Sequence, residues 1–185
     1  MGVDGSGKST LINKLIKSYS KKYKKIKYLH LRPYVFLIDK RTVVSDPHKN
    51  KSSHSKIISL TKIFVWLFIY KFFFLLNQNK KNQLIIFDRY AHDILIDKIR
   101  YRINLSNRLI KYLLNLFPEP HLWIILKAPI SIIEKRKKEM PTKVLEKQMI
   151  KYINFFHSKK NTLLIDTNKN YLKNISLIKK KISNL

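Results

Sequence analysis

The sequence predicts a three-layer α/β fold, a parallel sheet flanked by helices, because apolar strand-like runs alternate with segments of helical spacing. The runs expected to form strands are residues 25–31, 84–87, 121–126 and 162–165. The segments expected to form helices are residues 10–19, 57–76, 106–117, 129–136, 142–157 and 171–182. Strands joined through helices are typical of a parallel sheet, since a parallel pair needs a long crossover connection.

Length and composition indicate one cytoplasmic domain. At 185 residues the chain can bury a core of its own, and no Pro/Ser-rich linker divides it, so we expect residues 1–185 to form a single domain. The absence of cysteine excludes disulfides and thiolate metal sites. No charged start and apolar run of a signal peptide precede the first motif, so we expect the protein to remain in the cytoplasm.

The first ten residues carry a phosphate-binding motif. The segment GVDGSGKS fits the pattern G-x-x-x-x-G-K-[ST] and leads into a run of helical spacing. Glycines let backbone N–H groups turn inward around phosphate oxygens, and the helix that follows adds its dipole. The residues expected to bind ATP are Gly2, Val3, Asp4, Gly5, Ser6, Gly7, Lys8, Ser9 and Thr10. Lys8 is expected to reach the β and γ phosphates, and the Ser9 hydroxyl to bind Mg²⁺.

The chain has no other glycine, and this narrows the kind of P-loop protein that it can be. A switch GTPase needs a D-x-x-G segment and a transporter-type ATPase needs a glycine-rich signature, but no glycine follows Gly7. No Asn-Lys pair continues as N-K-x-D, so a guanine-specific pocket is unsupported. A P-loop NTPase fold of the small-kinase type remains.

A second motif, Asp88-Arg89-Tyr90, follows the apolar run 84–87. A carboxylate at the carboxyl end of a strand beside the P-loop is placed to hold the water shell of Mg²⁺ or to accept a proton. Arg89 is placed to clamp a phosphate. By itself the tripeptide is more typical of an ordinary surface ion pair, and it becomes informative only behind a P-loop.

A basic cluster begins at Arg136 and continues through Lys137 and Lys138. We expect residues 136–143 to form a lid, whose cations stabilise the negative charge of a transferring phosphoryl group. The alternative is that these cations are solvated and stabilise the carboxyl end of a helix.

The formal net charge of +28 raises the alternative of a nucleic-acid or membrane-surface protein with an inactive P-loop. The cations are scattered and are mostly lysine, which indicates a solvated surface, and we do not expect nucleic acid as the main partner. The apolar segment 57–76 is interrupted by Lys62 and Lys71 on opposite sides of a helix. We therefore expect a core or dimer helix and no membrane span.

Taken together, the motifs resemble the thymidylate kinase family over nearly the whole chain. The resemblance lies in GVDGSGKST at 2–10, Arg-Pro at 32–33, FDRY at 87–90 and PEP followed by a strand at 118–126. It implies that Asp4 contacts the sugar of an acceptor nucleotide and that Arg32 and Arg89, with Tyr90, bind its phosphate end. It also implies a catalytic arginine in the lid, for which Arg136 is the candidate, and a homodimer. From their own positions in the sequence, Ser9 and Asp88 are expected to bind the metal.

Three departures weaken the thymidine assignment. No glutamate accompanies Arg32, the segment 69–71 has no arginine, and the stretches 88–97 and 136–141 resemble a divergent branch associated with surface polysaccharide genes. In addition, Met1 alone precedes the loop, so we expect the central strand to lie upstream of the given sequence or to be missing from this copy.

The prediction is therefore an ATP-dependent phosphotransferase with Mg²⁺ as cofactor. Lys8, Asp88, Arg89 and Arg136 are its expected catalytic residues, and a nucleoside monophosphate, dTMP first, is its expected acceptor. A kinase of a nonthymidine, sugar-linked acceptor and the basic binding protein stay open as alternatives.

Overall fold

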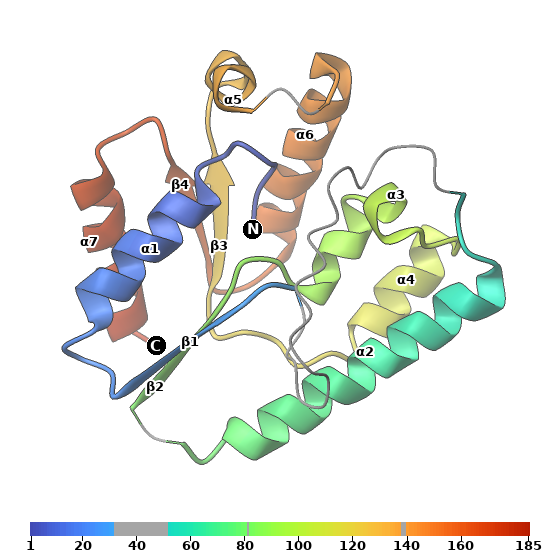
Figure 1. Cartoon of the computed structure of the whole chain (residues 1–185), viewed down its shortest axis with the longest axis horizontal. Helices are drawn as coiled ribbons and strands as arrows, with labels where there is room; N and C mark the ends of the chain where they lie inside the picture. Colours follow the sequence, from blue (N-terminus) through green and yellow to red (C-terminus); the bar gives the residue numbers. More distant parts are fainter. Residues whose placement is uncertain (32–51, 81, 138–139) are drawn as a thin grey trace. The chain divides into compact units, whose positions relative to one another are not determined.

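The computed structural model of the chain (Figure 1) describes residues 1–31, 52–80, 82–137 and 140–185. The strands are β1 (Lys25–Leu29), β2 (Gln83–Phe87), β3 (Trp123–Lys127) and β4 (Thr162–Asp166). The helices are α1 (Lys8–Tyr19), α2 (Lys56–Asn77), α3 (Lys98–Tyr101), α4 (Asn107–Leu114), α5 (Ile130–Arg136), α6 (Thr142–Ser158) and α7 (Tyr171–Ser183), with a 3₁₀ helix η1 (Ala91–Leu95). The predicted α/β class is confirmed.

The chain divides into two compact units, each built from segments that are distant in sequence. Unit 1 comprises Met1–Lys27, Asn82–Asp88 and Pro120–Leu185, and unit 2 comprises Tyr28–Lys81 and Arg89–Glu119. The chain thus passes from unit 1 to unit 2 within the motif Asp88-Arg89-Tyr90. The expectation of a single domain over residues 1–185 stays a prediction.

Unit 1 contains a layered α/β core. Strands β3 and β4 pair in parallel, from Trp123 opposite Thr162 to Lys127 opposite Asp166. Helices α1 and α7 cover one face of this pair, and α6 covers the other (Figure 1). The α1/α7 side of the core is formed by Leu11, Leu15, Tyr19, Leu126, Ile165 and Ile178. On the α6 side, the Trp123 and Phe155 rings meet edge to face at 5.0 Å.

Met1 lies along β3 in the manner of a strand residue. Its amino group donates to the carbonyl of Ile124 at 2.6 Å, and its carbonyl accepts from the N–H of Leu126 at 2.9 Å. This pattern is that of a parallel pair, and it uses backbone groups of β3 that alternate with those facing β4. The phosphate loop therefore starts from the β3 edge of the sheet. Strands β1 and β2 form a separate hydrogen-bonded pair.

Unit 2 is organised around one face of α2. The Tyr70 ring, fully buried, meets the rings of Tyr90 at 4.7 Å and Phe117 at 5.4 Å, both edge to face. Trp66 packs against Tyr101 at 5.7 Å, and the Lys62 ammonium donates to the Tyr101 carbonyl at 2.8 Å. These contacts fix α2 against the segment that follows Arg89.

The opposite face of α2 is also apolar, and it is exposed. Its large exposed side chains are Ile57, Ile58, Phe64, Val65, Phe68, Leu75 and Leu76. Positions 57, 64, 68 and 75 lie seven or four residues apart, which places them along one side of the helix. By length and composition α2 could cross a membrane, with a mean hydropathy of 1.8 over an 18-residue window, 28% of which is buried. The core helix of a soluble protein, which is mostly buried, also passes this test of length and composition.

The sequence predictions for individual elements agree with most of the structure. The predicted helix 106–117 ends earlier, at Leu114, because residues 115–117 continue as turns whose N–H groups bond to carbonyls three or four residues back. Two short elements, η1 and α3, were not predicted, since neither spans enough residues to display a helical period.

We predict that Ile178→Ala lowers the free energy of unfolding by about 2–5 kcal/mol, because Ile178 is completely buried in the α1/α7 side of the core. Urea unfolding followed by circular dichroism measures this change. Leu177→Ala is the matched control, since its side chain is 51% exposed, and it is expected to change stability by no more than about 0.5 kcal/mol. Equal effects of the two substitutions would contradict this description of the core.

Candidate functional site

The loop between Met1 and α1 depends on left-handed glycines. Gly5 has φ +83° and Gly7 has φ +86°, a region that costs other residues roughly 1–2 kcal/mol. The space beside Gly5 is also too small for a side chain, because a Cβ there would lie 3.0 Å from Ile133 Cγ2 and 3.1 Å from the Ile133 carbonyl oxygen. A Cβ on Gly7 would lie 3.2 Å from the Tyr171 hydroxyl. At both positions a side chain would strain the backbone conformation and clash with neighbouring residues, so the turn requires glycine.

The turn ends at the amino end of α1, where Gly7 is the N-cap residue. No side chain of the described residues caps this helix end. The N–H groups of a first turn, together with the helix dipole, make a site for an anion. The absence of an acidic residue from the first turn leaves this positive potential uncompensated there.

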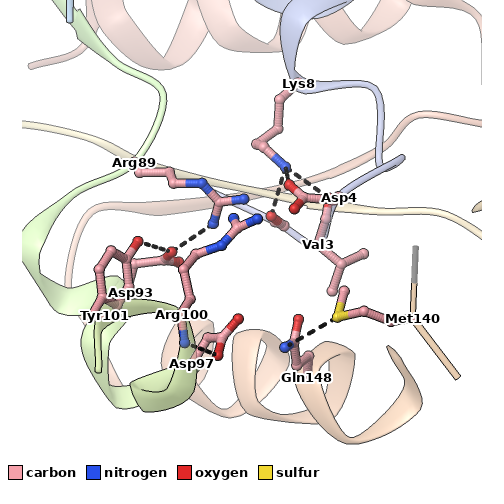
Figure 2. Close-up of polar contacts among 11 residues, drawn as sticks. Val3, Asp4, Lys8, Arg89, Asp93, Asp97, Arg100, Tyr101, Met140 and Gln148 are labelled. Atoms are coloured by element: carbon pink, nitrogen blue, oxygen red, sulfur yellow. Dashed lines mark hydrogen bonds and ion pairs between the residues drawn. The ribbon is translucent and has the colours of Figure 1, made fainter. Parts of the chain in front are cut away.

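The Lys8 side chain folds back over the loop (Figure 2). Its ammonium donates to the carbonyls of Gly2 at 2.9 Å and Val3 at 2.8 Å, and it pairs with Asp4 Oδ1 at 3.2 Å. The side chains of Lys8 and Asp4 are only 9% and 14% exposed. A buried ammonium needs such oxygen partners. Phosphate oxygens are chemically equivalent partners for an ammonium group.

The carboxyl end of α5 reaches the same loop. Arg136 Nη1 donates to the Thr167 hydroxyl at 3.4 Å, and the Thr167 hydroxyl donates to the Lys127 carbonyl at 3.3 Å. Thr167 in turn borders Gly7, since a Cβ on Gly7 would lie 3.4 Å from the Thr167 Cβ. The structure therefore brings Arg136, the predicted lid arginine, to the wall of the phosphate loop.

Sequence reasoning missed Thr167 and Tyr171, which form this wall. Both follow β4, the strand paired with β3, and Tyr171 also carries the Lys14 ammonium 4.0 Å from its ring centroid. The available signal was position, since side chains just beyond the carboxyl ends of parallel strands line the ligand crevice of α/β folds.

Asp88 and Ser9, the predicted metal ligands, differ in exposure. Asp88 is 7% exposed directly after β2, whereas Ser9 is exposed in the first turn of α1. In the described part of the chain, no group of three or more His, Asp or Glu residues could hold a metal ion. A fully protein-ligated metal centre is therefore not found there.

In unit 2, Arg89 belongs to a buried polar cluster (Figure 2). Its Nη1 atom contacts Asp93 Oδ2 at 2.6 Å, and the same oxygen accepts the Tyr101 hydroxyl at 2.6 Å. Burial, with the Asp93 carboxylate, raises the pKa of Tyr101 well above 10, against the opposing effect of Arg89 and Arg100. The phenol therefore stays protonated and donates to Asp93 throughout the neutral range.

The other predicted acceptor residues lie in different settings. Tyr90 is 2% exposed, its hydroxyl donates to the Pro118 carbonyl, and burial, with a smaller effect of Glu119, raises its pKa. Its ring belongs to the core of unit 2, so a role toward the acceptor stays a prediction. Arg32 and the lid residues 138–139 lie outside the described residues.

The comparisons with known proteins concern the fold. No protein-family model matches the sequence, and no curated protein matches it significantly. Among solved structures, thymidylate kinase from Candida albicans matches with a TM-score of 0.63 and 17% identity over 99% of this chain and 88% of that chain. Deoxyadenosine kinase from M. mycoides, with dCMP and dCDP bound, matches with a TM-score of 0.62 and 15% identity over 100% and 97%.

A third similar structure is the YorR protein from Bacillus subtilis, with a TM-score of 0.54 and 17% identity over 98% of this chain and 92% of that chain. The matches extend over nearly the full length of both chains, while the identities stay low. The chain therefore has a thymidylate-kinase-like fold, which the deoxyadenosine kinase structures share, carried by a divergent sequence.

Proposed function

We propose that the protein is a nucleotide kinase that transfers the γ-phosphoryl group of ATP to a nucleoside monophosphate, with dTMP as the first candidate acceptor. The observation that carries the proposal is the glycine loop at the amino end of α1, with Lys8 folded over it and Arg136 at its wall. The similar structures support it, since one is a thymidylate kinase and another is a deoxyadenosine kinase with dCMP and dCDP bound.

The loop is proposed to bind the donor. On ATP binding, the N–H groups of residues 5–9 would donate to the phosphate oxygens, while the Lys8 ammonium would exchange its loop carbonyls for the β and γ phosphates. This exchange removes little hydration from Lys8, because its ammonium is already held by protein oxygens. The site would thus be organised before the nucleotide arrives.

The oxygen donors of unit 1 suit Mg²⁺. This ion keeps several waters and takes one or two protein oxygens plus the substrate phosphates, so a carboxylate and a hydroxyl suffice. Asp88 and Ser9 would hold it, and the bound ion would neutralise charge on the β and γ phosphates. The absence of a larger acidic cluster among the described residues agrees with this kind of site.

Acceptor binding is assigned to Asp4, Arg32, Arg89 and Tyr90, with Asp4 at the sugar and the arginines at the phosphate. Asp4 contacts Lys8 in this structure, so it would have to be shared between the donor and acceptor ends of the site. Arg136 would stabilise charge on the transferring group, and Thr167 would orient its guanidinium. Catalysis by such groups is positioning and charge stabilisation, with no covalent intermediate. A cytoplasmic enzyme is proposed.

We predict that Lys8→Ala lowers kcat for phosphoryl transfer by at least about 100-fold, because the Lys8 cation is lost from the β and γ phosphates. The measurement is ADP release in a coupled assay, with circular dichroism as the test of folding. Lys17→Ala, in the last turn of the same helix and exposed, is the control and should retain full activity. Full activity of Lys8→Ala would overturn the proposed mechanism.

The same assay should include a panel of acceptors, namely dTMP, dCMP, dAMP, dGMP and a sugar phosphate. Turnover with dTMP that exceeds the others is the expected result. Turnover with the sugar phosphate alone would replace the nucleotide assignment while keeping the kinase.

Arg136→Ala is predicted to lower kcat by about 10²–10³-fold with a smaller change in the Kd for ATP, because the guanidinium is proposed to act on charge that develops during transfer. Stopped-flow transfer and equilibrium binding of an ATP analogue measure the two effects. Lys135→Ala removes a neighbouring exposed cation and is expected to retain kcat. An equal loss in both variants would instead assign the effect to the general charge of the lid.

The exposed apolar face of α2 is proposed as the contact between two copies of the chain. Contiguous exposed apolar side chains mark interaction sites. The stacked rings of Phe68 and Phe72, 6.2 Å apart, belong to this face of α2. Because each copy carries a formal charge of +28, association should strengthen as salt screens the repulsion.

Phe68→Glu is predicted to weaken self-association at least about tenfold, since it places a carboxylate in the middle of this face. Sedimentation velocity at several protein and salt concentrations measures the effect. The control Leu177→Glu adds the same charge at an exposed leucine of α7 and should leave the association unchanged. A wild-type protein that stays monomeric under all these conditions would remove the homodimer.

A further inference from the structure

Helices α1 and α7 carry no negatively charged side chain. No Asp or Glu occurs in residues 5–31 or 167–185, which contain these two helices, whereas both segments are rich in lysine. The helices lie side by side on one face of the β3/β4 pair (Figure 1). The charged side chains of this surface are therefore of one sign, which attracts anions.

An open hollow of about 460 Å³ lies toward the carboxyl ends of α1 and α7. Three lysines line it, namely Lys22, which follows α1, and Lys179 and Lys180 of α7. The ammonium groups of Lys22 and Lys179 lie over the rings of Tyr23 and Tyr19, 5.9 and 5.7 Å from the ring centroids. Within the described part of the chain, none of the three lysines forms a salt bridge. The hollow thus collects three positive charges that no carboxylate of the described residues pairs with.

Serine hydroxyls form most of the remaining lining. Ser18 and Ser183 donate to the carbonyls of Leu15 and Lys180 in their own helices, both at 2.9 Å, and Ser176 of α7 is the third serine of the hollow. These hydroxyls make the walls polar without adding negative charge. Walls of this kind favour a charged ligand over an apolar one.

The phenol of Tyr19 is buried beside these charges. Its side chain lines the hollow and is 3% exposed, and its hydroxyl has no hydrogen-bond partner among the described residues. A buried hydroxyl without a partner destabilises the fold, and phenylalanine would fill the same space without this cost. Burial, with a smaller effect of Tyr23, raises the pKa of Tyr19, so the phenol is a hydrogen-bond donor at neutral pH. The hydroxyl therefore needs an acceptor that the described residues do not supply.

We propose that this hollow is a second phosphate site, which binds a ligand with two or three linked phosphate groups. The three ammonium groups match the charge of such a phosphate chain, and the Tyr19 hydroxyl is a neutral donor to one of its oxygens. A volume of about 460 Å³ lies in the range of small-ligand sites. Lysine suits this ligand, because its flexible stem lets the ammonium group follow a phosphate chain that has no fixed geometry.

The hollow lies apart from the phosphate loop. Helix α1 has 12 residues, so about 18 Å of helix separates the loop at its amino end from the hollow at its carboxyl end. Phosphates bound at the loop therefore do not occupy the hollow. Binding at the hollow goes beyond the proposed kinase function and does not depend on it.

The test is an NMR titration of the isotope-labelled full chain with pyrophosphate and tripolyphosphate, at about 0.15 M ionic strength, where distant charges are screened. Saturable shifts are expected in residues 18–22 and 176–183, separate from those of the loop, residues 2–9. The double substitution Lys22→Gln with Lys179→Gln is expected to weaken binding at the hollow at least about tenfold, because two charge-assisted contacts are lost. Affinity at the loop should stay within about twofold.

The matched control is Lys143→Gln with Lys147→Gln. It removes the same charge from exposed positions of α6 in the same unit, and it should change the affinity of the hollow less than about twofold. Equal weakening by the two double substitutions, or unsaturable shifts at lysines throughout the chain, would indicate general attraction to the charge of +28 and overturn the proposal. Absence of saturable binding to the wild-type hollow would leave these lysines only the role of compensating helix dipoles, and would also overturn it.

Tyr19→Phe tests the phenol. It keeps the ring and is expected to weaken phosphate binding at the hollow about tenfold, because one hydrogen bond to a charged group is lost. The thermal unfolding temperature should stay the same or rise, since the removed hydroxyl has no partner among the described residues. A merely structural phenol would leave the affinity unchanged. That result would remove the donor that distinguishes the hollow from a general basic surface.

ATP and a single-stranded oligonucleotide distinguish the sources of the phosphate chain. Shifts of residues 176–183 by ATP as well as by tripolyphosphate would identify a nucleoside triphosphate as a ligand. Shifts by tripolyphosphate and not by ATP would identify an inorganic phosphate chain. Oligonucleotide binding that is tighter than either, and that strengthens with length, would replace the small-ligand site by a nucleic-acid surface.

Discussion

The left-handed turn between Met1 and α1 is the constraint on which the site of unit 1 depends. Backbone at φ +83° and +86° leaves no room for side chains at Gly5 and Gly7, and it allows Ile133 of α5 and Tyr171 of α7 to approach the loop directly. Those contacts bring the ends of α5 and of β4 to the phosphate loop. A chain that contains three glycines, all of them here, uses this residue where close approach requires it.

The second constraint is electrostatic and belongs to unit 2. Burying Asp93 without a partner would cost several kcal/mol, so Arg89 and Tyr101 are bound to it in a fixed arrangement. Such a pair contributes little net stability compared with an apolar contact of the same size. Its effect is to fix the orientation of the Arg89 side chain.

Helix α2 carries apolar side chains on two opposite faces, one buried and one exposed. Its buried side chains, among them Ile63, Trp66, Tyr70 and Phe73, form the core of unit 2, while the opposite side remains apolar and exposed. A helix that is apolar all round normally has both sides covered. The hydrophobic effect thus favours a further contact on the exposed side, and a charge of +28 on each copy opposes it.

The sequence by itself determined the α/β class, the elements near their observed bounds and the phosphate loop, because these depend on local patterns: apolar period, glycine position and residue type at a strand end. Tertiary structure decided what depends on distant segments. Thr167 and Tyr171 lie about 160 residues from the loop that they border, and Arg100 reaches the Arg89 cluster only because Asp97 starts a one-turn helix that no period could predict. The motif also did not predict that Arg89 pairs with Asp93, because residue order does not specify which charged side chains are buried together. Local patterns predict what each segment can form, whereas burial and charge compensation, which are properties of the assembled core, decide what each side chain contacts.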